Sequence, residues 1–102
     1  MATLHTVNQS PLMGSALASC VRLSREGSGI LLLEDAVLAC IASGESAELL
    51  REVMDSREVF VLEEDLAARG VSPARVLQEI SVVDYAGFVD LCTRYGKVQA
   101  WF

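Results

Sequence analysis

The sequence predicts a single α/β domain over residues 1–102, built on a mainly parallel sheet. Short β-prone segments alternate with helical segments along the chain, which is the order that repeated βαβ units produce. Residues 29–33 (GILLL) are apolar without alternation, as expected of a strand that is covered on both faces. A chain of 102 residues also has the usual size of one domain.

Runs of β-branched, aromatic and other apolar residues mark the expected strands. In chain order, these are residues 3–7, 29–33, 58–62, 80–83 and a closing strand at 98–101. No internal repeat, low-complexity tract or linker interrupts the alternation of strand and helix.

Capping signals place the helices between these strands. Ser10 is a favoured N-cap residue and Pro11 suits the first helical position, so a helix is expected from Pro11 to about Ser24. Asp84 is expected to cap the last helix, which should end at Tyr95. The other expected helical segments are residues 36–42 capped by Glu34-Asp35, residues 47–54 capped by Ser46, residues 63–69, and one turn at Ser72-Pro73.

The charge balance is acidic, because 8 Lys and Arg residues stand against 14 Asp and Glu residues, for a formal net charge of −6. Phosphate binding needs clustered cations, so no direct binding to nucleic acid or to anionic membranes is expected. No apolar run approaches the ~20 residues of a membrane-spanning helix, and no signal peptide is visible. A cytoplasmic location is expected.

The hydrophobic fraction of 52% is high for a small monomer and favours burial against other chains.

Motifs for the common cofactors are absent from the sequence. There is no GxGxxG, no GxxxxGK[ST] and no GxSxG, and the Gly27-Ser28-Gly29 run precedes a strand, where a tight turn is expected instead of a phosphate-binding loop. The three cysteines form no CxxC and there is one histidine, so no zinc site of usual spacing can be drawn. We therefore expect neither a metal nor a cofactor.

Three thiols and one imidazole are the candidate reactive groups. Cys20 lies near the middle of the apolar half of the first helix, Cys40 lies on a segment that is apolar all round, and His5 lies within a strand. None of the thiols lies at a helix N-terminus, where the dipole would favour the thiolate. Burial in the core is therefore favoured for all of them. The apolar half of the first helix is expected to contain Leu12, Met13, Ala16, Leu17, Cys20, Val21 and Leu23, and Cys92 should share a core face with Tyr85, Phe88 and Val89.

Acidic residues gather directly after two of the expected strands, at Glu34-Asp35 and Glu63-Glu64-Asp65. Carboxylates are stabilised near helix N-termini by the unpaired amides and the helix dipole. Helix stabilisation is therefore the favoured role of each pair.

Five segments, taken together and in order, resemble the DsrH/TusB family. They are residues 4–11 (LHTVNQSP), 30–35 (ILLLED), 62–70 (LEEDLAARG), 83–89 (VDYAGFV) and 99–101 (QAW). The resemblance runs from one end of the chain to the other. It implies a DsrE-like fold, with a five-stranded, mostly parallel sheet flanked by helices.

The same resemblance implies a role in sulfur transfer. Members are the smallest of three homologous subunits in a heterohexameric complex with DsrE/TusD-type and DsrF/TusC-type subunits. Sulfur moves there as a cysteine persulfide and passes to a DsrC/TusE-type carrier. DsrH members serve intracellular sulfur oxidation, and this function is favoured here. The alternative is a TusB-type subunit of the relay for 2-thiolation of the tRNA wobble uridine.

The family's principal persulfide cysteine belongs to the largest subunit, at the end of a strand that leads into an A-x-x-R-G helix. The comparable residues 61–70 of this chain keep Ala-Ala-Arg-Gly but supply Leu62 and three acidic residues in place of the cysteine. A carboxylate cannot carry sulfane sulfur.

Cys20 favours the DsrH branch and is the candidate accessory catalytic thiol. Two other classes stay open: a stand-alone thiol enzyme using Cys20 or Cys40, and a purely structural scaffold.

Overall fold

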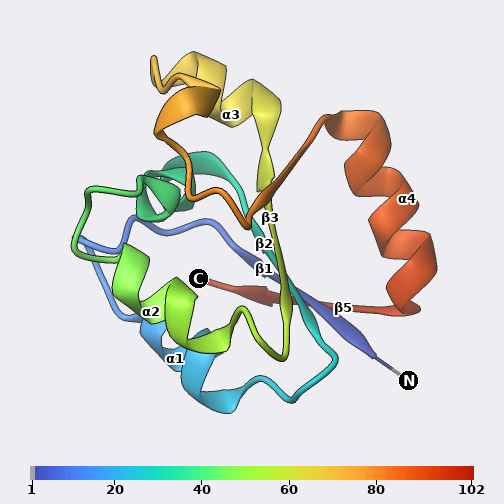
Figure 1. Cartoon of the computed structure of the whole chain (residues 1–102). Helices are drawn as coiled ribbons and strands as arrows, with labels where there is room; N and C mark the ends of the chain where they lie inside the picture. Colours follow the sequence, from blue (N-terminus) through green and yellow to red (C-terminus); the bar gives the residue numbers. More distant parts are fainter. Residues whose placement is uncertain (1) are drawn as a thin grey trace.

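The computed structural model describes residues 2–102, and its strands form one five-stranded sheet in the order β4-β3-β2-β1-β5 (Figure 1). Each pair of neighbouring strands runs parallel. The predicted α/β fold with a mainly parallel sheet is therefore confirmed. The strands are β1 (Thr3–Val7), β2 (Gly29–Leu32), β3 (Glu58–Leu62), β4 (Ser81–Val83) and β5 (Lys97–Trp101).

Helices cover the two faces of the sheet unequally (Figure 1). One face packs against α1 (Ala16–Leu23), the 3-10 helix η1 (Glu34–Cys40) and α2 (Ala47–Val53). The other face packs against α4 (Tyr85–Tyr95). Two short elements, α3 (Glu63–Ala68) and the 3-10 helix η2 (Pro73–Arg75), follow β3. Within the described residues, no helix is both long and apolar enough to cross a bilayer.

Each face of the sheet has its own apolar cluster. The larger one lies under α1, η1 and α2, and its fully buried members include Val7, Leu17, Cys20, Leu32 and Leu50. The smaller one joins the sheet to α4 and consists of Leu4, Leu31, Phe60, Leu91 and Tyr95. Burial of apolar surface at about 25 cal/mol per Å² makes these two clusters the main source of stability.

The first helix is shorter than predicted. It begins at Ala16 instead of Pro11, because Ser10 closes a local turn. The Leu12 amide donates to Ser10 Oγ at 3.2 Å, and the Met13 amide donates to the Ser10 carbonyl at 3.1 Å. Side-chain oxygens of serine often compete with helix formation in this way.

The shortened helix changes which side chains are buried. Leu12 and Met13 were expected in the core, but they lie in the turn and are 83% and 78% exposed. Leu23, at the end of α1, is also exposed. The remaining members of the predicted apolar half are buried as expected: Ala16, Leu17, Cys20 and Val21.

The segment after β2 also differs from the prediction. It forms a 3-10 helix, and Leu33 occupies its N-cap position without a side-chain cap, so Glu34 and Asp35 do not cap it. By contrast, Asp84 caps α4 as predicted, with its Oδ1 accepting from the Gly87 amide at 2.8 Å. Ser72 likewise caps the predicted turn at η2.

The face expected for Cys92 is only partly buried. Cys92 and Phe88 pack at the edge of the smaller cluster, but Tyr85 and Val89 are 55% and 66% exposed. Their exposure corrects the prediction of a continuous core face. It arises because α4 turns Leu91 and Tyr95 toward the sheet and leaves one side of its apolar stripe uncovered.

Gly29 permits the close approach of α4 to the sheet. A Cβ at this position would lie 2.6 Å from Cζ of Tyr95, whose ring is buried and whose hydroxyl donates to Glu58 Oε1 at 2.9 Å. We expect Gly29→Ala to lower the free energy of unfolding by about 1–3 kcal/mol, the usual cost of overpacking. Urea denaturation measures this effect. In a Tyr95→Leu background, which removes the ring that the added methyl group would meet, Gly29→Ala should lower the free energy of unfolding by less. An unchanged urea midpoint for Gly29→Ala in the wild-type background would contradict this close packing.

Candidate functional site

The carboxyl ends of β2 and β3 hold the acidic residues that the sequence places after these strands. Asp65 Oδ2 accepts from the Glu34 amide at 2.6 Å. Arg69 pairs with Asp35 at 2.9 Å and, more loosely, with Asp65 at 3.8 Å. The network consists of carboxylates and one guanidinium.

Glu34 has a strained backbone at this edge of the sheet. Its φ of 50° makes it the one residue other than glycine with a left-handed backbone within residues 2–102. Such a conformation costs about 1–2 kcal/mol. The charge-assisted hydrogen bond from its amide to Asp65 offsets part of that cost.

Glu64 links this acidic edge to the start of α4. Its Oε2 accepts from the Tyr85 amide at 3.3 Å, so the carboxylate lies at a helix N-terminus, where the dipole favours negative charge. Its Oε1 is buried without a partner. The sequence correctly associated these acidic residues with helix N-termini, but Glu64 serves the N-terminus of α4 and not that of its own helix.

The three thiols belong to the two apolar clusters of the sheet. Cys20 and Cys40 are fully buried in the larger cluster, and Cys92 on α4 is half-buried at the edge of the smaller cluster. Burial raises the pKa of Cys20 to about 12, although the positive charge of Arg57 opposes the rise. Burial also raises the pKa of Cys40 to about 11, and its Sγ donates to the Val37 carbonyl at 2.9 Å. At pH 8 a thiol of pKa 12 is ionised in about one molecule in 10⁴.

Alkylation with iodoacetamide at pH 8 should therefore modify Cys92 before Cys20 and Cys40. Thiolate and access together set the rate, and both are lost on burial. Peptide mass spectrometry over a time course measures the order, with urea-unfolded protein, in which all three cysteines should react, as the control. Cys20 reacting as fast as Cys92 in the folded chain would contradict the structure.

His5 is held by a tryptophan from the other end of the chain. The indole Nε1 of Trp101 donates to His5 Nδ1 at 3.0 Å, which joins β1 to the neighbouring strand β5. Burial and, secondarily, Arg57 lower the pKa of His5, so the ring is neutral at pH 7. Because Nδ1 accepts a hydrogen bond, the proton is on Nε2. This contact ties the ring of His5 into the sheet.

A pocket beside His5 was not foreseen from the sequence. It is bordered by a turn at residues 25–28. The sequence predicts a tight turn at Gly27-Ser28-Gly29, but the turn begins two residues earlier and Gly29 already belongs to β2. No sequence motif marked the pocket, because it joins residues from β1, β5 and the segment between α1 and β2. Within residues 2–102, no three His, Cys, Asp or Glu side chains converge as they would around a metal ion.

Comparison with known proteins decides the family. The family model described as "DsrH like protein" matches residues 9–98. The chain belongs to the DsrH/TusB family. It is 37% identical over 98 residues to "Protein TusB" of Shigella flexneri, covering 96% of this chain and 99% of that relative. It is 36% identical over 98 residues to "Protein TusB" of Escherichia coli (strain K12 / DH10B), with the same coverage.

Solved structures share the fold at much lower sequence identity. The ychN protein of E. coli matches with a TM-score of 0.76 at 16% identity, covering 98% of this chain and 99% of that chain. Protein MTH1491 of Methanobacterium thermoautotrophicum matches with a TM-score of 0.74 at 16% identity, covering 97% and 96%. At this low identity, the two matches support only the fold of the DsrH/TusB chain.

Proposed function

We propose that this chain is the small subunit of a cytoplasmic sulfur relay that serves 2-thiolation of the tRNA wobble uridine. The observation that carries the proposal is the 37% identity, over nearly the full length of both chains, to proteins named TusB. The family resemblance links that name to the relay.

Sulfur oxidation, which the sequence analysis favoured, has less support. That preference rested on Cys20, whereas the relatives carry the TusB name. Cys20 is fully buried in the larger cluster, where its side chain packs as a small apolar group. The tRNA-thiolation function is therefore the better supported of the two.

The proposed partners are a DsrE/TusD-type and a DsrF/TusC-type subunit, with a DsrC/TusE-type protein as the sulfur carrier. Exposed apolar side chains support an assembly, because a monomer gains nothing by leaving them in water. Val89 and Tyr85 on α4 are exposed, and so is Val98 on β5. Val98 is paired with Leu4, so its side chain lies on the same face of the sheet as α4.

Within this assembly, the chain is proposed to support transfer without carrying the principal persulfide. The acidic network at the ends of β2 and β3 replaces the thiol, and its negative charges would repel a persulfide anion. Cys20 is proposed as an accessory thiol at most, because burial disfavours its thiolate.

Loss of the chain from its native cell tests this function. We expect the 2-thiouridine content of wobble positions, measured by liquid chromatography and mass spectrometry of digested tRNA, to fall to a small fraction of normal. The wild-type chain and Cys20→Ala should both restore it. Unchanged thiouridine would refute the proposal, and unchanged thiouridine together with defective sulfur oxidation would select the other branch of the family.

A further inference from the structure

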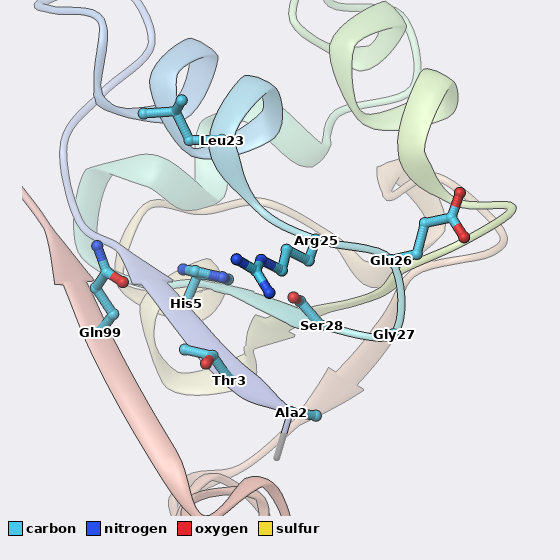
Figure 2. A pocket seen from close by; sticks show the side chains of 9 residues that line it. All are labelled: Ala2, Thr3, His5, Leu23, Arg25, Glu26, Gly27, Ser28 and Gln99. Atoms are coloured by element: carbon cyan, nitrogen blue, oxygen red, sulfur yellow. The ribbon is translucent and has the colours of Figure 1, made fainter.

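The pocket beside His5 has a volume of about 410 Å³ and gathers hydrogen-bond donors from separate parts of the chain. Its lining includes His5 from β1, Gln99 from β5, and Arg25 and Ser28 from the segment between α1 and β2. In Figure 2, the side chains of His5, Arg25 and Ser28 converge on one space, with the guanidinium between the imidazole and the hydroxyl. No part of the proposed sulfur-relay function uses this pocket.

His5 presents a fixed donor to the pocket. Its Nδ1 is occupied by the indole of Trp101, so its Nε2 carries the ring proton. His5 as a residue is 6% exposed, and its Nε2 makes no hydrogen bond among residues 2–102. Nε2 is not among the buried unpaired atoms, so it reaches the solvent of the pocket, where it can donate to a bound acceptor.

The turn at residues 25–28 brings the other donors to the same place. The Ser28 amide donates to the Arg25 carbonyl at 3.1 Å, which closes a four-residue turn. Gly27, its third residue, has a φ of 83°, as a type II turn requires at that position. Arg25 and Ser28 are therefore held side by side by the backbone, and Arg25 keeps its charged group exposed at the mouth of the pocket.

Arg25 and Glu26 are the charged residues that line the pocket, and Arg57 lies near it. The net charge of the chain is −6, yet the pocket is served by Arg25 and lies near Arg57, whose charge acts on His5. Arg57 also donates to the Ser24 carbonyl at the end of α1, which covers the negative end of that helix. The one carboxylate in the lining, Glu26, points away from the guanidinium of Arg25 (Figure 2).

We propose that this pocket binds a small tetrahedral oxyanion of the sulfate, thiosulfate or phosphate class. Arg25 supplies the charge, and the His5 Nε2–H and the Ser28 hydroxyl supply directed donors, with Gln99 at the side. Charge-assisted hydrogen bonds to such donors are the strong ones in anion recognition. The pocket is large enough to hold the ion together with water.

The single tryptophan gives this proposal a direct readout. The indole of Trp101 is hydrogen-bonded to Nδ1 of His5. An anion that binds Nε2 of the same imidazole should therefore change the fluorescence emission of Trp101. The full chain is titrated with sodium sulfate, thiosulfate and phosphate, and sodium chloride keeps the ionic strength constant because salt screens exposed charges. We expect a saturable change in emission, and saturable heat by calorimetry, with at least one of the three anions. Neither signal saturating with any of them would overturn the proposal.

Arg25→Gln and Arg22→Gln form a matched pair of variants. Both residues are exposed and both substitutions remove one positive charge, but Arg22 lies outside the pocket. Loss of one charged hydrogen bond predicts a drop in affinity of about tenfold or more for Arg25→Gln. Arg22→Gln should change affinity less than about twofold. Equal losses in the two variants would mean general charge attraction and would overturn the site.

A polynucleotide phosphate is the competing source of the same chemistry. A short single-stranded RNA is added in the same titration, and we expect it not to displace the free anion, because the acidic surface repels a polyanion. RNA that binds more tightly than free phosphate, with the same dependence on Arg25, would overturn a site for a small free ion.

Discussion

Val89→Lys is expected to abolish assembly of this chain with the two larger homologous subunits proposed as its partners. Val89 is 66% exposed on the side of α4 that its own sheet leaves uncovered. A lysine there would place a charge in the proposed apolar interface, and buried unpaired charges cost several kcal/mol. The wild-type chain, expressed alone, should self-associate or aggregate, and it should form a stable complex when the homologous subunits are co-expressed.

Size-exclusion chromatography with light scattering measures both outcomes. Gln78→Lys is the matched control. Gln78 is exposed in the turn before β4, so this substitution adds the same positive charge to the surface but not on α4. We expect Gln78→Lys to assemble as the wild type does. A wild-type chain that behaves as a monodisperse monomer and ignores both homologues would contradict the proposed assembly.

Cys20→Ser should destabilise the chain by about 1–3 kcal/mol, because it places a hydroxyl at a fully buried position among apolar side chains. Cys20→Ala removes the thiol without adding a polar group, so its cost reflects only the small cavity. Urea denaturation gives both free energies. In the assembled relay we expect Cys20→Ser to lower sulfur transfer only in part.

Comparing the two substitutions separates packing from chemistry. If transfer falls with serine but not with alanine, the thiol is dispensable and the serine effect comes from the core. Equal and complete loss of transfer in both variants, with the complex still assembled, would make Cys20 a required thiol.

The strands were the most predictable part of this fold. Residues 58–62 form β3 at the bounds expected, because an apolar run between polar residues leaves one choice of strand. The capping role of Asp84 was also local and therefore visible. The start of α1 was not predictable from Ser10-Pro11, because the same serine can close a turn.

The candidate sites depend on contacts that sequence spacing does not reveal. Asp65 bonds the amide of Glu34, 31 positions earlier, because β2 and β3 are neighbours in the sheet. Trp101 reaches His5 across 96 positions, because β5 returns to pair with β1. Burial of Cys20 was predictable from its place on the helix, since the apolar stripe continues through it.

Intact mass spectrometry of the assembled relay, after loading with a sulfane-sulfur donor, tests the account most directly. We predict that the DsrE/TusD-type partner gains one sulfur atom, that this chain gains little or none, and that transfer to the carrier stops when the partner subunit's cysteine is replaced. Stoichiometric sulfur on Cys20, with transfer lost when Cys20 is replaced by alanine, would contradict the account and make this subunit a catalyst.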